Sequence, residues 1–327
     1  MDVVKPRALE SGDTVAVVAP SGPVRRESLE RGVRLFEELG LKVKMGNSVM
    51  QRWGYLAGKD EERASDFMQA WSDPEVKAVI AARGGYGAMR ILPLLDFDCI
   101  RAHPKILMGY SDITALHLAL WKEANLVTFH GPVMEVWTSK MEGYNLACLR
   151  DVLFGKRTLG EIPVPVDEMP SEDVQRPAGL TVLEQGKASG RLVGGNLSLV
   201  ASTIGTPWEI QTKGCILFLE DVSEKPYRID RMLCQLRLSG KLDDAEGFCL
   251  GDFTDCESDP DPERPSFSVE EVLSQYFGRN GKPCLTGIPG GHGKYNGVLP
   301  LGIRVEITAD LGNSDSGKLT FLEKPTL

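Results

Sequence analysis

Residues 105–114, KILMGYSDIT, join a short apolar run to a polar turn that leads into a segment of helical periodicity. The apolar run predicts a buried strand ending near Gly109, and the apolar residues of segment 112–121 recur at helical spacing. Ser111 stands at the turn between them and has two interpretations. A serine before a helix is most often an N-cap. It is alternatively the nucleophile of a strand–turn–helix elbow, although the second glycine usual in that motif is absent.

The alternation of strand and helix continues on both sides of this stretch. Segment 14–19 is apolar on both faces, as in a strand covered by helices on two sides. This order of elements predicts an α/β fold with a mostly parallel sheet, Rossmann-like or flavodoxin-like, and helices on both faces. The predicted strands are 14–19, 41–45, 76–82, 106–109 and 127–132, and the predicted helices are 27–39, 60–71, 88–95 and 112–121.

The composition changes after this first unit. Residues 156–180 are rich in proline and acidic residues and have little periodicity, which predicts a linker. We therefore expect an N-terminal α/β domain over 1–155 and a C-terminal domain over 181–327. In the second unit, Asn196 is placed to cap a short helix. The predicted strands there are 215–220, 247–251, 304–307 and 318–321, and the predicted helices are 227–238 and 269–277.

Bulk properties exclude several classes of protein. The 327-residue chain has a net charge of −9, which disfavours a sequence-independent nucleic-acid binder. No apolar run is long enough to span a bilayer, and residues 1–13 lack the apolar core of a secretory signal. The seven cysteines are odd in number, widely spaced and without a C-x-x-C pair, so neither a disulfide framework nor a zinc ribbon is indicated. We expect a cytoplasmic protein without a metal, a cofactor or a membrane partner.

A nucleophilic serine needs a base within hydrogen-bonding distance, and the four histidines can be considered singly. His117 lies six residues after Ser111, which on a helix is roughly 9 Å along the axis and about 240° around it, so it cannot reach the hydroxyl. His103 lies in a polar turn, and His130 at a strand end has either a structural role or a place in a pocket. His292 is flanked by glycines, which predict a close approach of the backbone to another group and leave the imidazole as either that of an ordinary loop residue or the base.

The candidate for the acid that orients the base is Glu220. It follows the apolar run 216–219, where a strand would deliver a carboxylate at its carboxyl end, although strands also often end on a charged residue. Ser111, Glu220 and His292 fall in the order nucleophile, acid, base. That order recurs in α/β hydrolases.

The segment RGGYG at residues 83–87, here called the glycine loop, has two interpretations. One is a phosphate cradle at a helix N-terminus, although neither the dinucleotide fingerprint nor a following G-K-[ST] is present. The other is a bare turn that faces the same cleft as Ser111, because both loops leave the carboxyl ends of parallel strands. The backbone amides of Gly85 and Asp112 could then form an oxyanion hole.

Several of these stretches together resemble the LD-carboxypeptidase family (muramoyltetrapeptide carboxypeptidases), almost from end to end of the chain. They occur in the family's order, which is far more specific than any one of them alone. The matching stretches are 17–22, 83–87, 109–114, 130–132, 194–197, 219–222, 226–231 and 291–293. The family's elbow also lacks the second glycine, so the missing glycine in this chain is no longer an objection.

The resemblance implies a serine peptidase with a Ser-Glu-His triad, here Ser111, Glu220 and His292, and an oxyanion hole at Gly85 and Asp112. It implies a parallel-sheet domain that carries the serine and a β-rich α+β C-terminal domain that carries the acid and base, with the site between them. The implied activity is removal of D-alanine from murein tetrapeptides in peptidoglycan recycling, at the bond that joins the L-centre of a diamino acid to D-alanine. The implied assembly is a homodimer.

The expected peptide substrate ends in a carboxylate, and the protein is acidic overall, so a local cation is needed. Arg83, Arg90 and Arg228 are the candidates, and Tyr86 is a further candidate contact.

Two other functions stay open. Some members of the resembled family are immunity enzymes of the microcin C type that cleave a peptidyl- or aminoacyl-nucleotide antibiotic. Such an enzyme needs an aromatic platform for the base, for which Trp53, Tyr55, Trp208 and Tyr295 are candidates. The other possibility is a non-catalytic protein that binds its ligand at the glycine loop.

Overall fold

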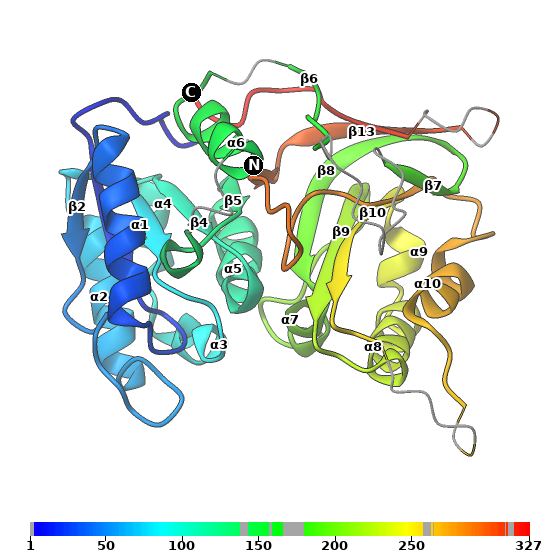
Figure 1. Ribbon diagram of the computed structural model, residues 1–327, viewed down its shortest axis with the longest axis horizontal. Helices are drawn as coiled ribbons and strands as arrows, with labels where there is room; N and C mark the ends of the chain where they lie inside the picture. The colour runs from blue at the N-terminus through cyan, green and yellow to red at the C-terminus, as the bar shows by residue number, and fades with distance from the viewer. Residues whose placement is uncertain are drawn as a thin grey trace.

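The computed structural model describes residues 3–137, 143–156, 159–165, 180–257, 263, 265–310, 312 and 317–327. It consists of two sheets with helices packed against them, one built mainly from the first half of the chain and the other from the second (Figure 1). This arrangement confirms the α/β fold class, with a parallel sheet first and a β-rich unit after it.

The first sheet has six strands in the order β12-β5-β4-β3-β1-β2, and its five N-terminal strands are parallel. Successive side chains of β1 point to opposite faces of the sheet, and the apolar ones on each face are covered by helices. Val15 and Val17 pack in the cluster that contains Phe36 of α1, and Val18 packs in the cluster that contains Phe67 of α2. The elements are β1 (Thr14–Val18), α1 (Arg26–Glu38), β2 (Lys42–Met45), α2 (Asp60–Ser72), β3 (Val76–Ala81), α3 (Ala88–Ile91), η1 (Leu92–Leu94), α4 (Phe97–Ala102), β4 (Ile106–Gly109), η2 (Ser111–Ile113), α5 (Thr114–Ala124), β5 (Thr128–His130), η3 (Met134–Val136) and α6 (Tyr144–Leu153).

The second sheet has eight strands in the order β6-β14-β13-β8-β9-β10-β11-β7. Its central strands β8, β9, β10 and β11 are parallel to one another, and antiparallel strands flank them. The side chain of Asn196 caps α7 by accepting a hydrogen bond from the Leu199 amide, as predicted. The elements are β6 (Gly160–Glu161), β7 (Thr181–Glu184), β8 (Gly186–Asn196), α7 (Leu197–Ser202), β9 (Cys215–Val222), α8 (Pro226–Leu238), α9 (Lys241–Asp244), β10 (Gly247–Thr254), α10 (Val269–Phe277), β11 (Cys284–Thr286), β12 (Leu299–Leu301), β13 (Arg304–Ala309) and β14 (Lys318–Phe321).

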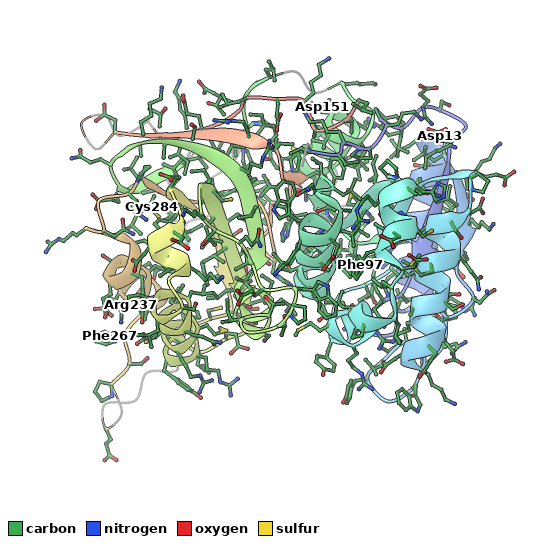
Figure 2. All side chains as sticks on the ribbon, turned by 180° about the vertical axis from the view of Figure 1, so that it is seen from behind. Asp13, Phe97, Asp151, Arg237, Phe267 and Cys284 are labelled. Carbon is green, nitrogen blue, oxygen red and sulfur yellow. The ribbon has the colours of Figure 1, made fainter. Side chains whose placement is uncertain are left out.

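The two halves are joined by a strand as well as by side-chain packing. β12 comes from the second half but pairs antiparallel with β5 at the edge of the first sheet, where Leu299 lies opposite His130. Directly after it, Gly302 donates a hydrogen bond to the Leu192 carbonyl of β8, which belongs to the second sheet. Elsewhere on the boundary, Phe97 of α4, which is labelled in Figure 2, packs against Trp208, with 6.2 Å between ring centroids.

Several elements differ from the sequence prediction for local reasons. The predicted helix 88–95 is divided into α3 and η1, because Pro93 has no N–H to extend an α-helical ladder. The predicted helix 112–121 begins as η2 and continues as α5 to Ala124. The elements that were not predicted are short, rich in glycine or dependent on distant partners: α4, α6, α9, β6, β7, β8, β11 and β12.

Most of the predicted linker lies outside the described residues. Within it, Gly160–Glu161 forms β6 and pairs with β14. Among the helices of the described ranges, none has both the length and the apolar character that a bilayer crossing requires.

His117 lies inside the first half and does not face Ser111. It is buried on α5, and its Nε2 lies 2.9 Å from the Gly109 carbonyl oxygen, which requires Nε2 to carry the proton. Burial lowers the pKa of His117 from 6.5 to about 4. The expectation that His117 cannot serve as the base agrees with this placement.

The buried imidazole of His117 predicts a specific loss of stability in acid. The unfolded chain takes up a proton as the pH falls below 6.5, whereas the folded chain does not until about pH 4. The stabilisation is therefore complete above pH 6.5, and about 3 kcal/mol of it is lost as the pH falls to 4. In His117→Gln, which keeps an N–H donor but does not titrate, the free energy of unfolding measured in urea should depend less on pH over this interval. The exposed His103→Gln should behave like the wild type, and an unchanged pH dependence in His117→Gln would contradict the prediction.

Candidate active site

Ser111 occupies a sharp turn at the carboxyl end of β4. Its φ of 63° lies in the left-handed region, which is uncommon for a residue with a side chain. The turn is tight because Gly109 has no Cβ, and one placed there would lie 2.8 Å from Ile113 Cγ1. Ser111 caps neither helix: the N-cap positions of η2 and α5 are Tyr110 and Ile113, without side-chain cap bonds. The N-cap interpretation is therefore wrong, and the segment has the strand–turn–helix form that the elbow interpretation predicts.

Glu220 and His292 form a hydrogen-bonded pair. His292 Nδ1 lies 2.7 Å from Glu220 Oε2, and the Glu220 side chain is fully buried on β9. Burial raises the pKa of Glu220, and the interaction with His292 counteracts it. Because a carboxylate accepts, Nδ1 donates, and Nε2 of a neutral His292 is then free to take a proton.

The glycines that flank His292 explain how its loop reaches the buried acid. A Cβ at Gly291 would collide with the Glu220 carboxylate, and one at Gly293 would collide with Asp252. The backbone therefore passes directly over these two carboxyl groups. The close backbone approach that the sequence indicated is to Glu220 itself.

Contacts between the halves bring this pair next to the elbow. The ring of Tyr110, the residue before Ser111, lies 4.7 Å from the His292 ring between centroids. The backbone N–H of Asn196 donates a hydrogen bond of 3.0 Å to Thr114 Oγ1, which links the end of β8 to the start of α5. In the sheet, Asn196 pairs with Glu220. The structure thus brings Glu220 and His292 close to Tyr110, the residue that precedes Ser111.

His130 lies behind this group and is fully buried. Its ring is 6.1 Å from that of Tyr110 and 5.1 Å from that of Phe218, between centroids. Burial lowers its pKa well below the usual value for histidine. Its packing is that of a structural residue beneath Tyr110, one of the two roles that the sequence left open.

The glycine loop passes against Ser111. A Cβ at Gly84 would lie 2.9 Å from Ser111 Cβ, so only glycine permits this approach. Gly85 follows with a φ of 109°, which also favours glycine. The backbone of this loop, with the candidate oxyanion residue Gly85, therefore lies beside the elbow and the other candidate, Asp112.

A cavity of about 500 Å³ opens beside the glycine loop. Arg83 and Tyr86 contribute to it, together with Tyr55, whose ring centroid is 5.7 Å from that of Tyr86. The Arg83 guanidinium also bonds Glu135 at 3.2 Å and the Pro23 carbonyl at 2.8 Å. The sequence indicates Tyr55 only as a platform for a nucleotide base, because its proximity to Tyr86 depends on two loops that are distant in sequence.

The other two candidate arginines have different surroundings. Arg90 binds Asp60 through two nitrogens at 3.0 and 2.8 Å. Arg228 is half-exposed on α8, where it contacts Glu224 and Tyr227. Neither contributes to the cavity that contains Arg83.

The chain is similar to known proteins over most of its length. Residues 15–131 match the model of the LD-carboxypeptidase N-terminal domain, and residues 189–307 match that of the C-terminal domain. A probable murein peptide carboxypeptidase of Bacillus subtilis is 44% identical over 300 residues, which cover 92% of this chain and 90% of the relative.

Two solved structures are also similar. The muramoyltetrapeptide carboxypeptidase of Oxalobacter formigenes has a TM-score of 0.80 and 30% identity, over 96% of this chain and all of that one. A mutant of the microcin C7 self-immunity protein MccF in complex with adenosine monophosphate has a TM-score of 0.85 and 26% identity, over 99% of this chain and all of that one.

The fold and the comparisons define a hydrolase of the serine-type carboxypeptidase class. Since the two family models together match well over half of its residues, the chain belongs to the LD-carboxypeptidase family.

Proposed function

We propose that this enzyme removes the terminal D-alanine from murein tetrapeptides, with Ser111 as nucleophile, His292 as base and Glu220 as the acid that orients it. The observation that carries the proposal is the buried Glu220–His292 hydrogen bond of 2.7 Å beside the strained Ser111 turn. The names of the Bacillus and Oxalobacter relatives support the choice of a murein peptide as substrate.

The proposed reaction is an acyl transfer in two stages. Ser111 Oγ attacks the carbonyl carbon before D-alanine, and its proton passes to His292 Nε2. The C–N bond then breaks as the imidazolium returns that proton to the departing amine of D-alanine. Water, deprotonated by His292, attacks the ester and releases the tripeptide carboxylate with Ser111 restored.

Glu220 and the two amides have separate parts in this reaction. Glu220 holds Nδ1 as the donor and stabilises the imidazolium, while the N–H groups of Gly85 and Asp112 hold the oxyanion, each contributing about 3 kcal/mol to its stabilisation. Arg83 and Tyr86 are proposed to contact the peptide, since both line the cavity that contains Gly85. A cytoplasmic location and a homodimer stay predictions.

One observation favours a second candidate, the cleavage of an aminoacyl-nucleotide antibiotic. Tyr55 and Tyr86 expose their rings at the rim of the same cavity, where either ring could stack on a nucleotide base. The similarity to MccF in complex with adenosine monophosphate is consistent with that use.

A panel of substrates distinguishes the two functions. The wild-type protein is incubated with a murein tetrapeptide ending in D-alanine, with the same peptide ending in L-alanine, and with an aminoacyl sulfamoyl adenosine. Mass spectrometry should show release of D-alanine alone. Cleavage restricted to the adenosine compound would establish the second function, and no cleavage of any of the three would overturn both.

A further inference from the structure

The carboxylate of Asp112 has a role in the structure distinct from that of its backbone amide. We propose that Asp112 and Arg63 are positioning residues that fix the glycine loop (residues 83–87) so that the Gly85 N–H faces the oxyanion. The inference rests on the proposed function, because it assumes that Ser111 is acylated and that Gly85 and Asp112 supply the amides.

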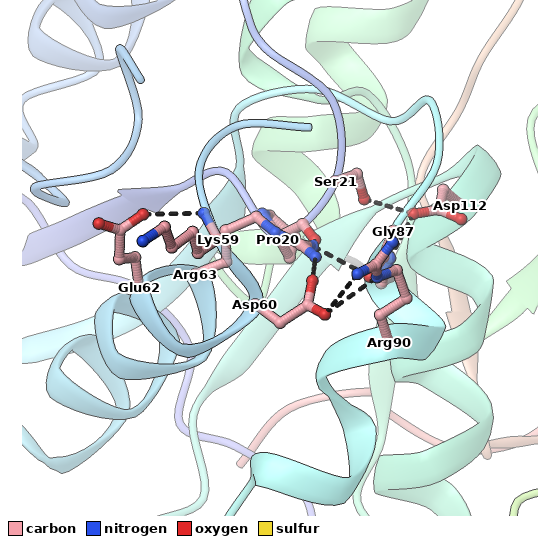
Figure 3. Close-up of polar contacts among 10 residues, drawn as sticks. Pro20, Ser21, Lys59, Asp60, Glu62, Arg63, Gly87, Arg90 and Asp112 are labelled. Atoms are coloured by element: carbon pink, nitrogen blue, oxygen red, sulfur yellow. Dashed lines mark hydrogen bonds and ion pairs between the residues drawn. The ribbon is translucent and has the colours of Figure 1, made fainter. Parts of the chain in front are cut away.

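Asp112 binds two loops with a single oxygen. Its Oδ2 accepts a hydrogen bond of 2.6 Å from Ser21 Oγ (Figure 3) and one of 2.7 Å from the Ala88 amide. Ser21 belongs to the loop after β1, and Ala88 directly follows the glycine loop. Asp112 and Ser21 are buried, so water does not compete for these bonds.

Arg63 of α2 binds the same two loops through backbone carbonyl groups, whereas Asp112 binds them through hydrogen-bond donors. Its Nη1 donates to the Gly87 carbonyl at 2.9 Å and to the Pro20 carbonyl (Figure 3). The guanidinium is buried and paired with Asp60. The Arg63 cation thus holds the carbonyl groups of Pro20 and Gly87. The Asp112 carboxylate holds hydrogen-bond donors of the next residue in each loop, Ser21 and Ala88.

The glycine loop is consequently fixed on both sides of Gly85. Before it, the Gly84 carbonyl accepts a hydrogen bond of 3.1 Å from the Gly22 amide. After it, Gly87 and Ala88 are held by Arg63 and Asp112. Gly85 lies between these anchors. Because glycine has no side chain to restrict its backbone, the anchors must fix its conformation.

This connection matters for catalysis because an oxyanion hole depends on donors that are already in place when charge develops. Asp112 directly follows the nucleophile in sequence. The residue that supplies one amide of the proposed hole therefore also anchors the loop that supplies the other. Displacing Ser111 and Gly85 relative to each other requires breaking buried, charge-assisted hydrogen bonds.

The test separates an oxyanion defect from a general loss of structure. Asp112→Ala should lower kcat by about 100-fold, the effect of losing one oxyanion donor, while KM changes little. Asp112→Asn retains an oxygen of the same reach and should restore most of the loss. The probes are a boronic acid analogue of the murein tripeptide, whose tetrahedral oxygen occupies the oxyanion position, and the tripeptide product with an ordinary carboxylate.

The two probes and a matched buried carboxylate give the decisive comparison. Asp112→Ala should lower the binding affinity for the boronate by roughly the factor by which it lowers kcat/KM. The affinity for the tripeptide product should not change. Asp66 is also buried in the first half, and it accepts a hydrogen bond from the Ser48 amide instead of from Ser21 or Ala88. Asp66→Ala should lower the melting temperature without separating the two affinities. Equal weakening of both probes by Asp112→Ala would overturn the inference.

A double-mutant cycle tests whether Ser21 acts through Asp112. Ser21→Ala alone should give an intermediate loss of kcat, and it should add nothing in the Asp112→Ala background. Additive losses would contradict the proposed connection. If Ser111→Ala retains hydrolysis, the proposed function itself fails. If Ser111→Ala is inactive but Asp112→Ala turns over like the wild type, only this inference fails.

Discussion

Replacement of Ser111 by alanine is expected to lower the turnover of murein tetrapeptide by about 10⁴-fold or more, because no other group then forms the acyl bond. The fold should remain, since alanine removes only Oγ from a side chain whose Cβ already packs against Gly84. D-alanine release measured by mass spectrometry gives the rate, and circular dichroism gives the melting temperature.

A serine elsewhere provides the control for that variant. Ser202 lies on α7, and its Oγ bonds the Ser198 carbonyl of the same helix. Ser202→Ala should therefore turn over at the wild-type rate. Near-normal release of D-alanine by Ser111→Ala would disprove the assignment of the nucleophile.

The second large effect is expected from Glu220→Gln, which should lower kcat by about 10⁴-fold at neutral pH. The glutamine side chain is nearly the same size but can present an N–H to His292 Nδ1, which favours the tautomer with the proton on Nε2. That tautomer cannot accept the Ser111 proton, and the neutral amide does not stabilise the imidazolium. Steady-state kinetics should show the loss in kcat, with a smaller change in KM.

The neighbouring residue on β9 gives a matched control for Glu220. Asp221 is also buried, but it accepts hydrogen bonds from Ser198 Oγ at 2.8 Å and from Asn196 Nδ2 at 3.0 Å. Asp221→Asn should lower the melting temperature while retaining most of the turnover. A Glu220→Gln enzyme as active as Asp221→Asn would show that Glu220 does not orient the base.

Much of the first sheet was predictable because its pattern is local. Strands such as Val76–Ala81 are continuous apolar runs, and the βαβα order requires them to be parallel. Periodicity also gave α10 (Val269–Phe277) with its correct bounds. In contrast, β12 has three residues and includes Pro300, so nothing in its own sequence indicates that it pairs with β5.

The candidate site was predictable in part, and for different reasons at each residue. Distance along a helix was enough to exclude His117, and the glycines around His292 indicated a close backbone approach. That approach could not be assigned to Glu220 from local sequence, because 72 residues separate the bonded pair. The hydrogen bonds of the Asp112 and Arg63 side chains could not be predicted, because they join loops that only the folded sheet brings together.

The pairing of β12 with β5 limits how members of this family can exchange parts. A chimera that takes the second half from a relative would also place the relative's β12 at the edge of this chain's first sheet. Leu299 and Leu301 would then have to fit against His130 and Thr128, the residues opposite them here. His292 lies just upstream of that strand, so a poor fit at the graft would also displace the candidate base. Compatible halves must therefore match at β5 and β12 as well as at the reacting groups.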